Sequence, residues 1–257
     1  MMLKKSETKN NGLFQPKAAL LFFLTVMPLI SAEMIMIKGG ELRSPLSNKK
    51  VVLINNFFID ETAVTNREYA LFVAQNQQWK KNHVLKIFSD KRYLEHWSNS
   101  ENVGNSDLED SPVTNVSWFA ARAYCIWNEK RLPMADEWEY VGNSKPVNYA
   151  GDLKKYILEW YSKPTLETTP HIKSTFKNEM GVWDMHGLIW EWVDDYNTYF
   201  FTGESRADSA LEKLMFCGSG SLGFSDASDY ALFMRLAFRS SLQAAYTTRN
   251  LGFRCAR

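Results

Sequence analysis

The chain has 257 residues, of which 45% are hydrophobic and 14% aromatic, and 30 basic residues stand against 29 acidic ones for a formal net charge of +1. A charge this close to neutral provides no bulk attraction to nucleic acid or to an anionic membrane surface, so no nucleic-acid partner is expected. The length suits one domain with a sizeable core, and no internal repeat, low-complexity tract or linker divides it.

The first 32 residues have the pattern of a secretory signal peptide. Four lysines and one glutamate precede an apolar run from Ala18 to Ile30, and the small residues Ser31 and Ala32 follow it. We predict cleavage after Ala32, which would leave a mature domain, 33–257, in the periplasm or outside the cell without stable membrane insertion. The alternative is an uncleaved anchor, but the run is shorter than the roughly 20 residues that a spanning helix needs. No cysteine follows the cut directly, so a lipoprotein is not expected.

Two extended segments open the mature part. Residues 33–38 alternate between apolar and other side chains and end at the glycine pair 39–40, which predicts a strand and a turn. Residues 51–60 form a second apolar run, which the pair Asn55-Asn56 interrupts. This run predicts another strand with a break in the middle.

A helix and a long polar stretch come next. Thr65 can accept a hydrogen bond from the backbone three residues later, where Glu68 can reach back, and this capping box predicts a helix to about Gln75. Residues 77–111 are mostly polar, so we expect a long surface excursion. Its aromatic residues are expected to anchor it, namely Trp79, Tyr93 and Trp97.

The second half of the sequence predicts two further helices. Asn115 or Ser117 can cap a helix over residues 118–130, where apolar side chains recur at helical spacing. Pro133 suits the first turn of a short helix that ends near Tyr140. The remainder is punctuated by Gly, Asn and Ser, so no long regular element is expected there.

Three tracts carry a resemblance to a known family. They are Ser111–Tyr140, with its Lys130-Arg131-Leu132-Pro133 segment, then Gly187–Trp192, and Asn250–Cys255. In this order they resemble the formylglycine-generating enzyme, or sulfatase-modifying factor, family. The resemblance covers nearly all of the chain after the leader. It implies an irregular α+β fold with little regular secondary structure, related to C-type lectins.

The cysteines follow the family only in part. The mature chain has Cys125, Cys217 and Cys255. The resemblance implies a disulfide between Cys125 and Cys255, and it leaves Cys217 free; the alternative is a reduced Cys125 on an apolar helix face. A second bridge of the family would join the positions of Gly142 and Leu236, neither of which is a cysteine here.

The chemistry of the family depends on a cysteine pair that this chain lacks. Active members have the pair between a Gly-Gly-Ser turn and an Arg-x-Ala-x-Arg segment, where it binds copper. Here no cysteine lies between Ser219 and Arg235, and the single thiolate of Cys217 cannot replace two. Copper and formylglycine formation are therefore not expected, and no catalytic residue is assigned.

Other positions of the family's peptide-binding cleft are retained. Ser219, Arg239 and Asn250 match residues that line it in active members. A guanidinium beside hydroxyl and amide groups can hold a carbonyl or a carboxylate without a metal. The alternative is that Arg239 and Asn250 satisfy backbone groups in a core rich in loops.

Metal binding has weak support in the sequence. The four histidines show no short ligand spacing. Leu188 replaces an asparagine of a calcium site in the family, which leaves Asp184 and Glu191 as oxygen donors and calcium as the one ion to consider.

These observations favour an exported protein of the formylglycine-generating-enzyme type that is not an active formylglycine oxidase. We expect it to bind a peptide or an exported protein partner as an accessory or maturation factor. One alternative is a metal-dependent oxidase or another enzyme that acts on a peptide or small molecule in the same cleft. Sugar binding, suggested by the lectin-related fold, is a third reading.

Overall fold

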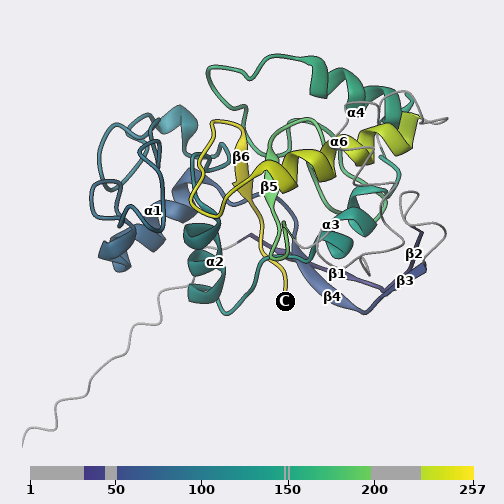
Figure 1. Cartoon of the computed structure of the whole chain (residues 1–257), viewed down its shortest axis with the longest axis horizontal. Coiled ribbons are helices and arrows are strands. Elements are labelled where there is room, and N and C mark those ends of the chain that lie inside the picture. Colours follow the sequence, from purple (N-terminus) through teal and green to yellow (C-terminus); the bar gives the residue numbers. More distant parts are fainter. Residues whose placement is uncertain (1–31, 44–50, 148, 150, 198–226) are drawn as a thin grey trace, which may run out of the picture.

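The computed structural model describes residues 32–43, 51–147, 149, 151–197 and 227–257 (Figure 1). It confirms the expected α+β class, because short strands and helices are joined by long irregular segments. Among the residues described, no helix has both the length and the apolar character needed to cross a bilayer.

The N-terminal part forms two small antiparallel sheets. The two apolar runs predicted strands here, but not β2, which begins at Gly40, and not how the strands pair. In one, Met34 of β1 lies opposite Asp60 of β4, and in the other Gly40 of β2 lies opposite Ile54 of β3. The predicted break at residues 55–56 separates β3 from β4. The strands are β1 (Met34–Ile37), β2 (Gly40–Arg43), β3 (Val51–Ile54) and β4 (Phe57–Asp60).

Helix α1 (Asn66–Gln75) begins at the predicted capping box. The backbone N–H of Glu68 donates to Thr65 Oγ1 over 3.2 Å, and the Glu68 carboxylate accepts from the Thr65 N–H over 2.8 Å. Two backbone donors at the start of the helix are thereby satisfied. The buried face of α1 includes Tyr69 and Phe72, which pack in the main core.

The polar stretch after α1 is an irregular excursion anchored by aromatic side chains, as expected. Its regular elements are two 3₁₀ turns, η1 (Gln77–Trp79) and η2 (Ser106–Leu108). Tyr93 is 2% exposed and Trp97 is 1% exposed. These two rings fix the middle of the excursion to the core.

Helix α2 (Trp118–Trp127) is capped by Ser117, whose Oγ accepts from the backbone of Ala120 over 3.2 Å. Asn115, the other candidate cap, instead has a positive φ of 53° before the helix. The helix ends three residues earlier than predicted, because Glu129 also adopts a positive φ, 56°, and turns the chain.

Helix α3 (Ala135–Gly142) corrects the prediction for Pro133. The N-cap is Met134, so Pro133 precedes the helix instead of occupying its first turn. Met134 has no cap oxygen, but the carboxylate of Glu137 accepts from its backbone N–H over 2.8 Å. One half of a capping box therefore persists without the hydroxyl residue.

The expectation that no long element follows α3 was wrong. Helix α4 (Leu153–Ser162) starts at Asp152, whose carboxylate accepts from the backbone of Lys154 over 2.9 Å. Helix α6 (Ala227–Ser241) has 15 residues and packs against α4. In α6 the buried residues recur at helical spacing, but two of the five are arginines, so they do not form an apolar stripe; they are Ala231, Leu232, Arg235, Leu236 and Arg239.

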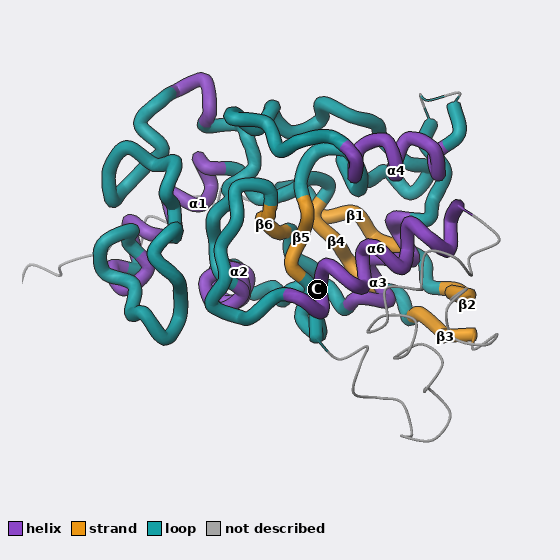
Figure 2. The backbone as a smooth tube through the Cα atoms, turned by 45° about the horizontal axis from the view of Figure 1, so that its top comes forward, coloured by secondary structure: helices purple, strands orange, loops and turns teal. Residues whose placement is uncertain are grey.

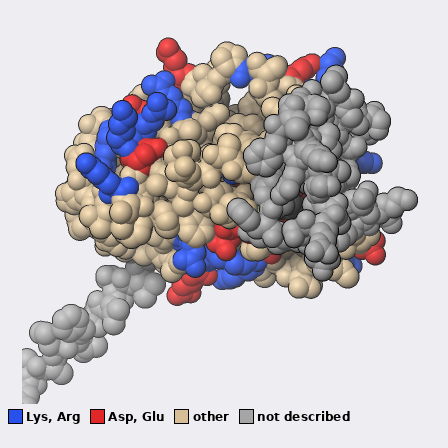
Figure 3. All heavy atoms as spheres, viewed as in Figure 1, with Lys and Arg blue, Asp and Glu red and all other residues tan. Residues whose placement is uncertain are grey.

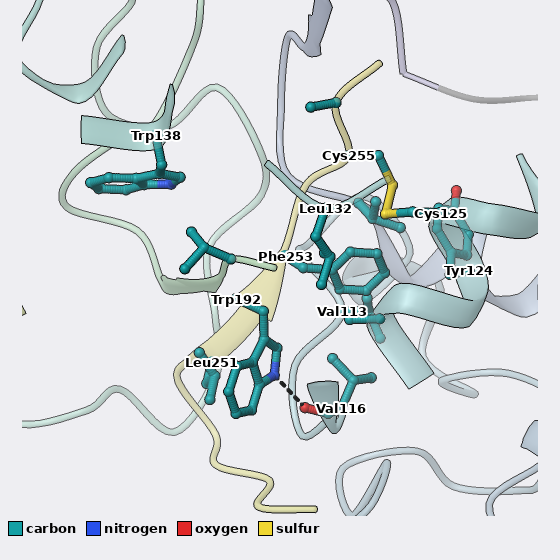
Figure 4. Packing of buried hydrophobic residues seen from close by; sticks show 14 of the residues in the cluster. Val113, Val116, Tyr124, Cys125, Leu132, Trp138, Trp192, Leu251, Phe253 and Cys255 are labelled. Atoms are coloured by element: carbon teal, nitrogen blue, oxygen red, sulfur yellow. Dashed lines mark hydrogen bonds between the residues drawn. A yellow bond between two sulfur atoms is a disulfide. The ribbon is translucent and has the colours of Figure 1, made fainter. Parts of the chain in front are cut away.

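The C-terminal segment completes the centre of the molecule. Strand β5 (Trp190–Trp192) pairs in parallel with β6 (Leu251–Phe253), and both views show this pair between the α1–α2 side and the α3–α4–α6 side (Figures 1 and 2). Beyond β6, Ala256 bridges to Ile59 of β4 and to Arg131. Figure 4 shows the core around Phe253, where the Trp192 indole donates to the Val116 carbonyl over 2.9 Å.

Candidate binding site

The structure joins Cys125 of α2 to Cys255, which follows β6, in a disulfide with a Cα–Cα distance of 5.6 Å. Figure 4 shows it beside the rings of Tyr124 and Phe253. Both cysteines are completely buried. The cross-link therefore ties the C-terminal segment to α2 inside the core, in the pairing that the family resemblance implied.

The chain has three cysteines, so this bridge leaves one thiol, that of Cys217. Cys217 and the predicted cleft residue Ser219 lie outside the described residues. At Gly142, where the family has a bridging cysteine, aromatic rings occupy the space. A Cβ atom there would lie 3.1 Å from Trp138 and 3.3 Å from His186 Nε2.

The structure places Arg239, a predicted cleft residue, in a buried ion cluster. Arg235 and Arg239 are one helical turn apart on α6 and both face Glu139 of α3. Glu139 accepts from Arg235 Nη2 over 2.6 Å and from Arg239 Nη1 over 2.8 Å. The Arg239 guanidinium also lies over the Trp138 ring, 4.7 Å from its centroid. This arginine therefore links α6 to α3 through a side-chain carboxylate and not through backbone groups.

Charge and burial act in opposite directions on Glu139. Burial would raise its pKa, but the positive charges of Arg235 and Arg239 prevail and lower the pKa to about 2. The neighbouring His186 responds to the same surroundings, because burial and then the Arg235 charge lower its pKa to about 3. At neutral pH the cluster therefore contains one carboxylate, two guanidinium groups and a neutral imidazole.

Asn250, another predicted cleft residue, lies at the entry to β6 and is half-buried. Its backbone carbonyl accepts from Trp190 N over 2.7 Å, and its side-chain oxygen accepts from Thr248 Oγ1 over 3.1 Å. Among the described residues, no hydrogen bond joins Asn250 to Arg239. The two cleft candidates are thus held by separate partners.

Asp184 and Glu191, the candidate calcium ligands, are buried and already hydrogen-bonded. Both oxygens of Glu191 accept from Arg254, over 2.8 Å each, and one also accepts from the Trp138 indole over 2.7 Å. Asp184 accepts from the backbone N–H groups of Lys173 and Thr175. No group of three or more His, Cys, Asp or Glu side chains that could hold a metal occurs in the described ranges. A calcium ion would have to compete with these protein donors for the two carboxylates.

A cavity of about 410 Å³ lies beside the segment that contains Asn250. Three segments supply most of the polar groups that line it: Glu95–His96, Ser111–Asn115 and Glu167–Thr169, with Arg249 next to Asn250 in the chain. Hydrogen bonds fix these walls to one another, since Ser111 Oγ donates to the carbonyl of Thr169 over 2.8 Å. The volume is within the usual range of small-ligand sites.

The cavity has a buried floor and an exposed rim. Ser111, Thr114 and Asn115 are at most 3% exposed, whereas Glu95, Glu167 and Arg249 are exposed. Within the described part of the chain, His96 Nδ1 and both amide atoms of Asn115 are buried without a hydrogen-bond partner. These atoms are also within reach of one another, because burial lowers the pKa of His96 while a side-chain hydrogen bond with Asn115 acts to raise it.

Sequence reasoning did not identify this cavity as a site. Asn115 was considered only as a possible helix cap, and His96 is one of the four histidines without short ligand spacing, because the segments that meet at the cavity are far apart in sequence. No local motif marks them. Figure 3 shows that basic and acidic side chains are interspersed on the described part of one face, in keeping with the near-neutral net charge.

The family model described as "Sulfatase-modifying factor enzyme 1-like domain" matches residues 27–257. The chain belongs to this family. The chain is 29% identical to the formylglycine-generating enzyme of Streptomyces coelicolor, over 80% of this chain and 79% of that protein. The Bos taurus protein named inactive C-alpha-formylglycine-generating enzyme 2 is also 29% identical, over 80% of this chain and 78% of that protein.

Two further comparisons bear on the extent of the domain and on its fold. The serine/threonine-protein kinase Pkn1 of Chlamydia trachomatis is 29% identical over 72% of this chain, but the match spans only 30% of that longer protein. The structure of PvdO from Pseudomonas aeruginosa superposes with a TM-score of 0.51 and 17% identity, and the match covers 88% of this chain and 94% of PvdO. The fold of the family is therefore present here.

Proposed function

We propose that this member of the family is exported and binds a segment of another exported protein, as an accessory or maturation factor, without oxidising cysteine to formylglycine. The observation that carries the proposal is that a disulfide occupies two of the three cysteines. Two of the three are buried in the Cys125–Cys255 disulfide, which leaves a single thiol in the whole chain. A copper site built from two thiolates cannot form from one.

The comparisons are consistent with this proposal. The family includes a relative whose name describes it as inactive, and that relative matches this chain as extensively as the Streptomyces enzyme does. A fold of this kind can therefore persist without the oxidase reaction, because binding and chemistry depend on different residues of one scaffold.

Export is supported by the leader-like residues 1–32, which lie almost entirely outside the described residues, and by the disulfide. Disulfides form and persist in oxidising compartments such as the periplasm. A buried bridge that ties α2 to the segment after β6 suits a protein that folds there.

An activity assay tests the absence of oxidase chemistry. The purified chain is incubated with copper(I), oxygen and a cysteine-containing peptide, and the peptide is analysed by mass spectrometry, with the Streptomyces coelicolor enzyme as the positive control. We expect aldehyde from the control enzyme only. An aldehyde formed by this chain at a rate above that of its Cys217→Ser variant would refute the proposal.

A binding experiment tests the second part of the proposal, that the chain binds a segment of another exported protein. The wild-type chain, the Asn250→Ala variant and the control Asn143→Ala, which removes an exposed amide at the end of α3, are used to capture proteins from a periplasmic extract. We expect one partner that the wild type and the control retain and that Asn250→Ala retains at least fivefold less. Equal retention by all three chains would exclude binding at the Asn250 segment.

A further inference from the structure

The irregular excursion after α1 contains an exposed apolar turn, residues 85–88. Leu85 is 61% exposed, Ile87 is 71% exposed and Phe88 is 36% exposed. Single apolar side chains on a surface are common, but three within four positions form a patch. A patch of this kind indicates a surface that another molecule covers.

The turn is closed at its base, so its apolar side chains cannot fold back into the core. The Leu85 carbonyl accepts from the backbone N–H of Phe88 over 2.8 Å and from that of Ser89 over 3.3 Å. The Phe88 ring packs against Phe119, with centroids 5.4 Å apart, and against Trp79, with centroids 6.0 Å apart. Phe88 is therefore the root of the turn, and Leu85 and its neighbour at position 87 extend from it into solvent.

Positive charge surrounds this turn. Residues 80–92 contain five basic residues and one acidic residue, Asp90. The Asp90 carboxylate is engaged elsewhere, because it accepts from the Thr247 N–H over 3.0 Å and from Thr247 Oγ1 over 2.5 Å. Figure 3 shows several basic side chains over the side of the molecule where Figure 1 draws α1 and the excursion. Three exposed basic side chains of this segment form no ion pair or hydrogen bond within the described ranges, namely Lys86, Lys91 and Arg92.

An anionic lipid surface satisfies both kinds of side chain at once. Apolar side chains at such a surface are buried at the boundary between headgroups and acyl chains, while lysine and arginine keep their charged ends beside the lipid phosphates. Each basic side chain near the surface adds to the attraction. A protein partner would need a pocket shaped for each extending side chain, whereas a fluid lipid surface adapts to them. Since the whole chain is nearly neutral, the attraction is confined to this segment.

We propose that residues 85–88 rest on the anionic headgroup surface of a membrane. Leu85 and Ile87 lie between the headgroups, and Lys86, Lys91 and Arg92 lie beside the lipid phosphates. The contact is peripheral, because a four-residue turn reaches only the boundary of the acyl chains. This inference goes beyond the proposed function, since the turn is distant in sequence from the Asn250 segment, and either can fail without the other.

A dye that reports the polarity of its surroundings tests the contact. Ile87→Cys and the matched control Leu53→Cys are each labelled with NBD maleimide on the full chain, in a Cys217→Ser background that has no other free thiol. Leu53 is also 71% exposed, but it lies on β3. With vesicles in which about 30% of the lipid is phosphatidylglycerol, we expect the emission at position 87 to rise at least threefold and that at position 53 to change less than 1.5-fold.

Three results of this experiment would overturn the proposal. They are no rise at position 87, an equal rise at both positions, and the same rise with vesicles of phosphatidylcholine alone. The leader-like residues 1–32 are the same in both labelled chains, so they cannot produce a difference between the two positions.

The basic residues are tested in the chain labelled at position 87. The double variant Lys86→Gln and Lys91→Gln is compared with Lys163→Gln, which removes an exposed lysine at the end of α4. At a lipid concentration that gives the parent half of its maximal emission, we expect the rise to be at least fivefold smaller in the double variant and to change less than 1.5-fold in the control. Raising sodium chloride from about 0.1 M to about 0.5 M should act in the same direction, because salt screens the attraction. Emission that neither change reduces would contradict the assigned charges.

A second copy of the chain is the other occupant that the patch could accept. Sedimentation velocity without lipid, on the full wild-type chain and on Ile87→Ser, distinguishes the two. We expect both chains to sediment alike. A wild-type dimer that Ile87→Ser dissociates would assign the patch to self-association and overturn the proposal.

Discussion

Replacing Glu139 by glutamine removes the one negative charge between Arg235 and Arg239 and leaves the shape of the side chain almost unchanged. The pKa of Glu139 falls from 4.5 to about 2 in the folded protein, although burial alone would raise it. At about 1.4 kcal/mol per pKa unit, the cluster favours the ionised form by roughly 3 to 4 kcal/mol. All three side chains are at most 4% exposed, so solvent screens this interaction little.

We therefore expect Glu139→Gln to lower the free energy of unfolding by about 3 to 5 kcal/mol, because the two buried guanidinium groups lose the carboxylate to which both are hydrogen-bonded. For a domain of this size the melting temperature should fall by roughly 10 °C. The matched control is Glu137→Gln on the same helix. Glu137 pairs with Arg131, which is 42% exposed, and glutamine can still cap the helix, so the control should cost less than about 1 kcal/mol.

Urea denaturation followed by tryptophan fluorescence measures both variants. The pH dependence provides an independent check on the cause. Glu139 binds a proton near pH 4.5 when unfolded and only near pH 2 when folded, so its stabilisation is complete above about pH 5 and is lost as the pH falls from 4.5 toward 2. The unfolding free energy of Glu139→Gln should not show this additional loss between pH 4.5 and pH 2. A loss of stability no larger than that of Glu137→Gln would refute the ion-cluster explanation.

Three further predictions follow from other buried groups. Burial in the fold lowers the pKa of His186 from 6.5 to about 3, so the stabilisation by its neutral form should decline as the pH falls below 6.5. Urea denaturation at pH 7 and at pH 5 should therefore show a smaller loss of unfolding free energy between the two pH values in His186→Gln than in the wild type. The Cys125–Cys255 bridge spans 130 residues, and replacing both cysteines by serine should cost about 5 kcal/mol. Non-reducing peptide mapping should recover this pair, and a cross-link to the third cysteine would contradict the assignment. Gly252→Ala would place a Cβ 2.4 Å from the Val113 carbonyl oxygen, so calorimetry should show a loss of more than about 2 kcal/mol in the free energy of unfolding. A near-neutral result would mean that β6 can move away from the Val113 backbone, against the close packing described.

Local signals in the sequence identified the elements whose causes are local. The Thr65–Glu68 capping box and the Ser117 cap each involve residues only three apart, and both helices begin where these residues predict. The break at residues 55–56 likewise separates two strands. The ends of helices were less predictable, because a single positive φ at Glu129 ends α2 early.

Features that depend on distant parts of the chain were harder to predict. The family resemblance pointed to Arg239 as a cleft residue, but its partner, Glu139, is 100 residues away in the sequence. The carbonyl of Asn115 accepts from the backbone of Leu94, and its N–H donates to Thr248, so the cavity exists only when three loops meet. Neither arrangement has a periodicity or spacing that a single sequence reveals.

The central position of β6 and the residues after it constrains when the molecule can acquire its structure. Leu251, Phe253 and Ala256 are completely buried against segments synthesised much earlier, including β4 and Val113. During synthesis, those earlier segments keep their apolar surfaces uncovered until residue 256 has been added. Folding in the cell would then depend on holding the chain open, and a chain that lacked β6 and Ala256 would be a degradation-prone polypeptide in place of a shortened domain.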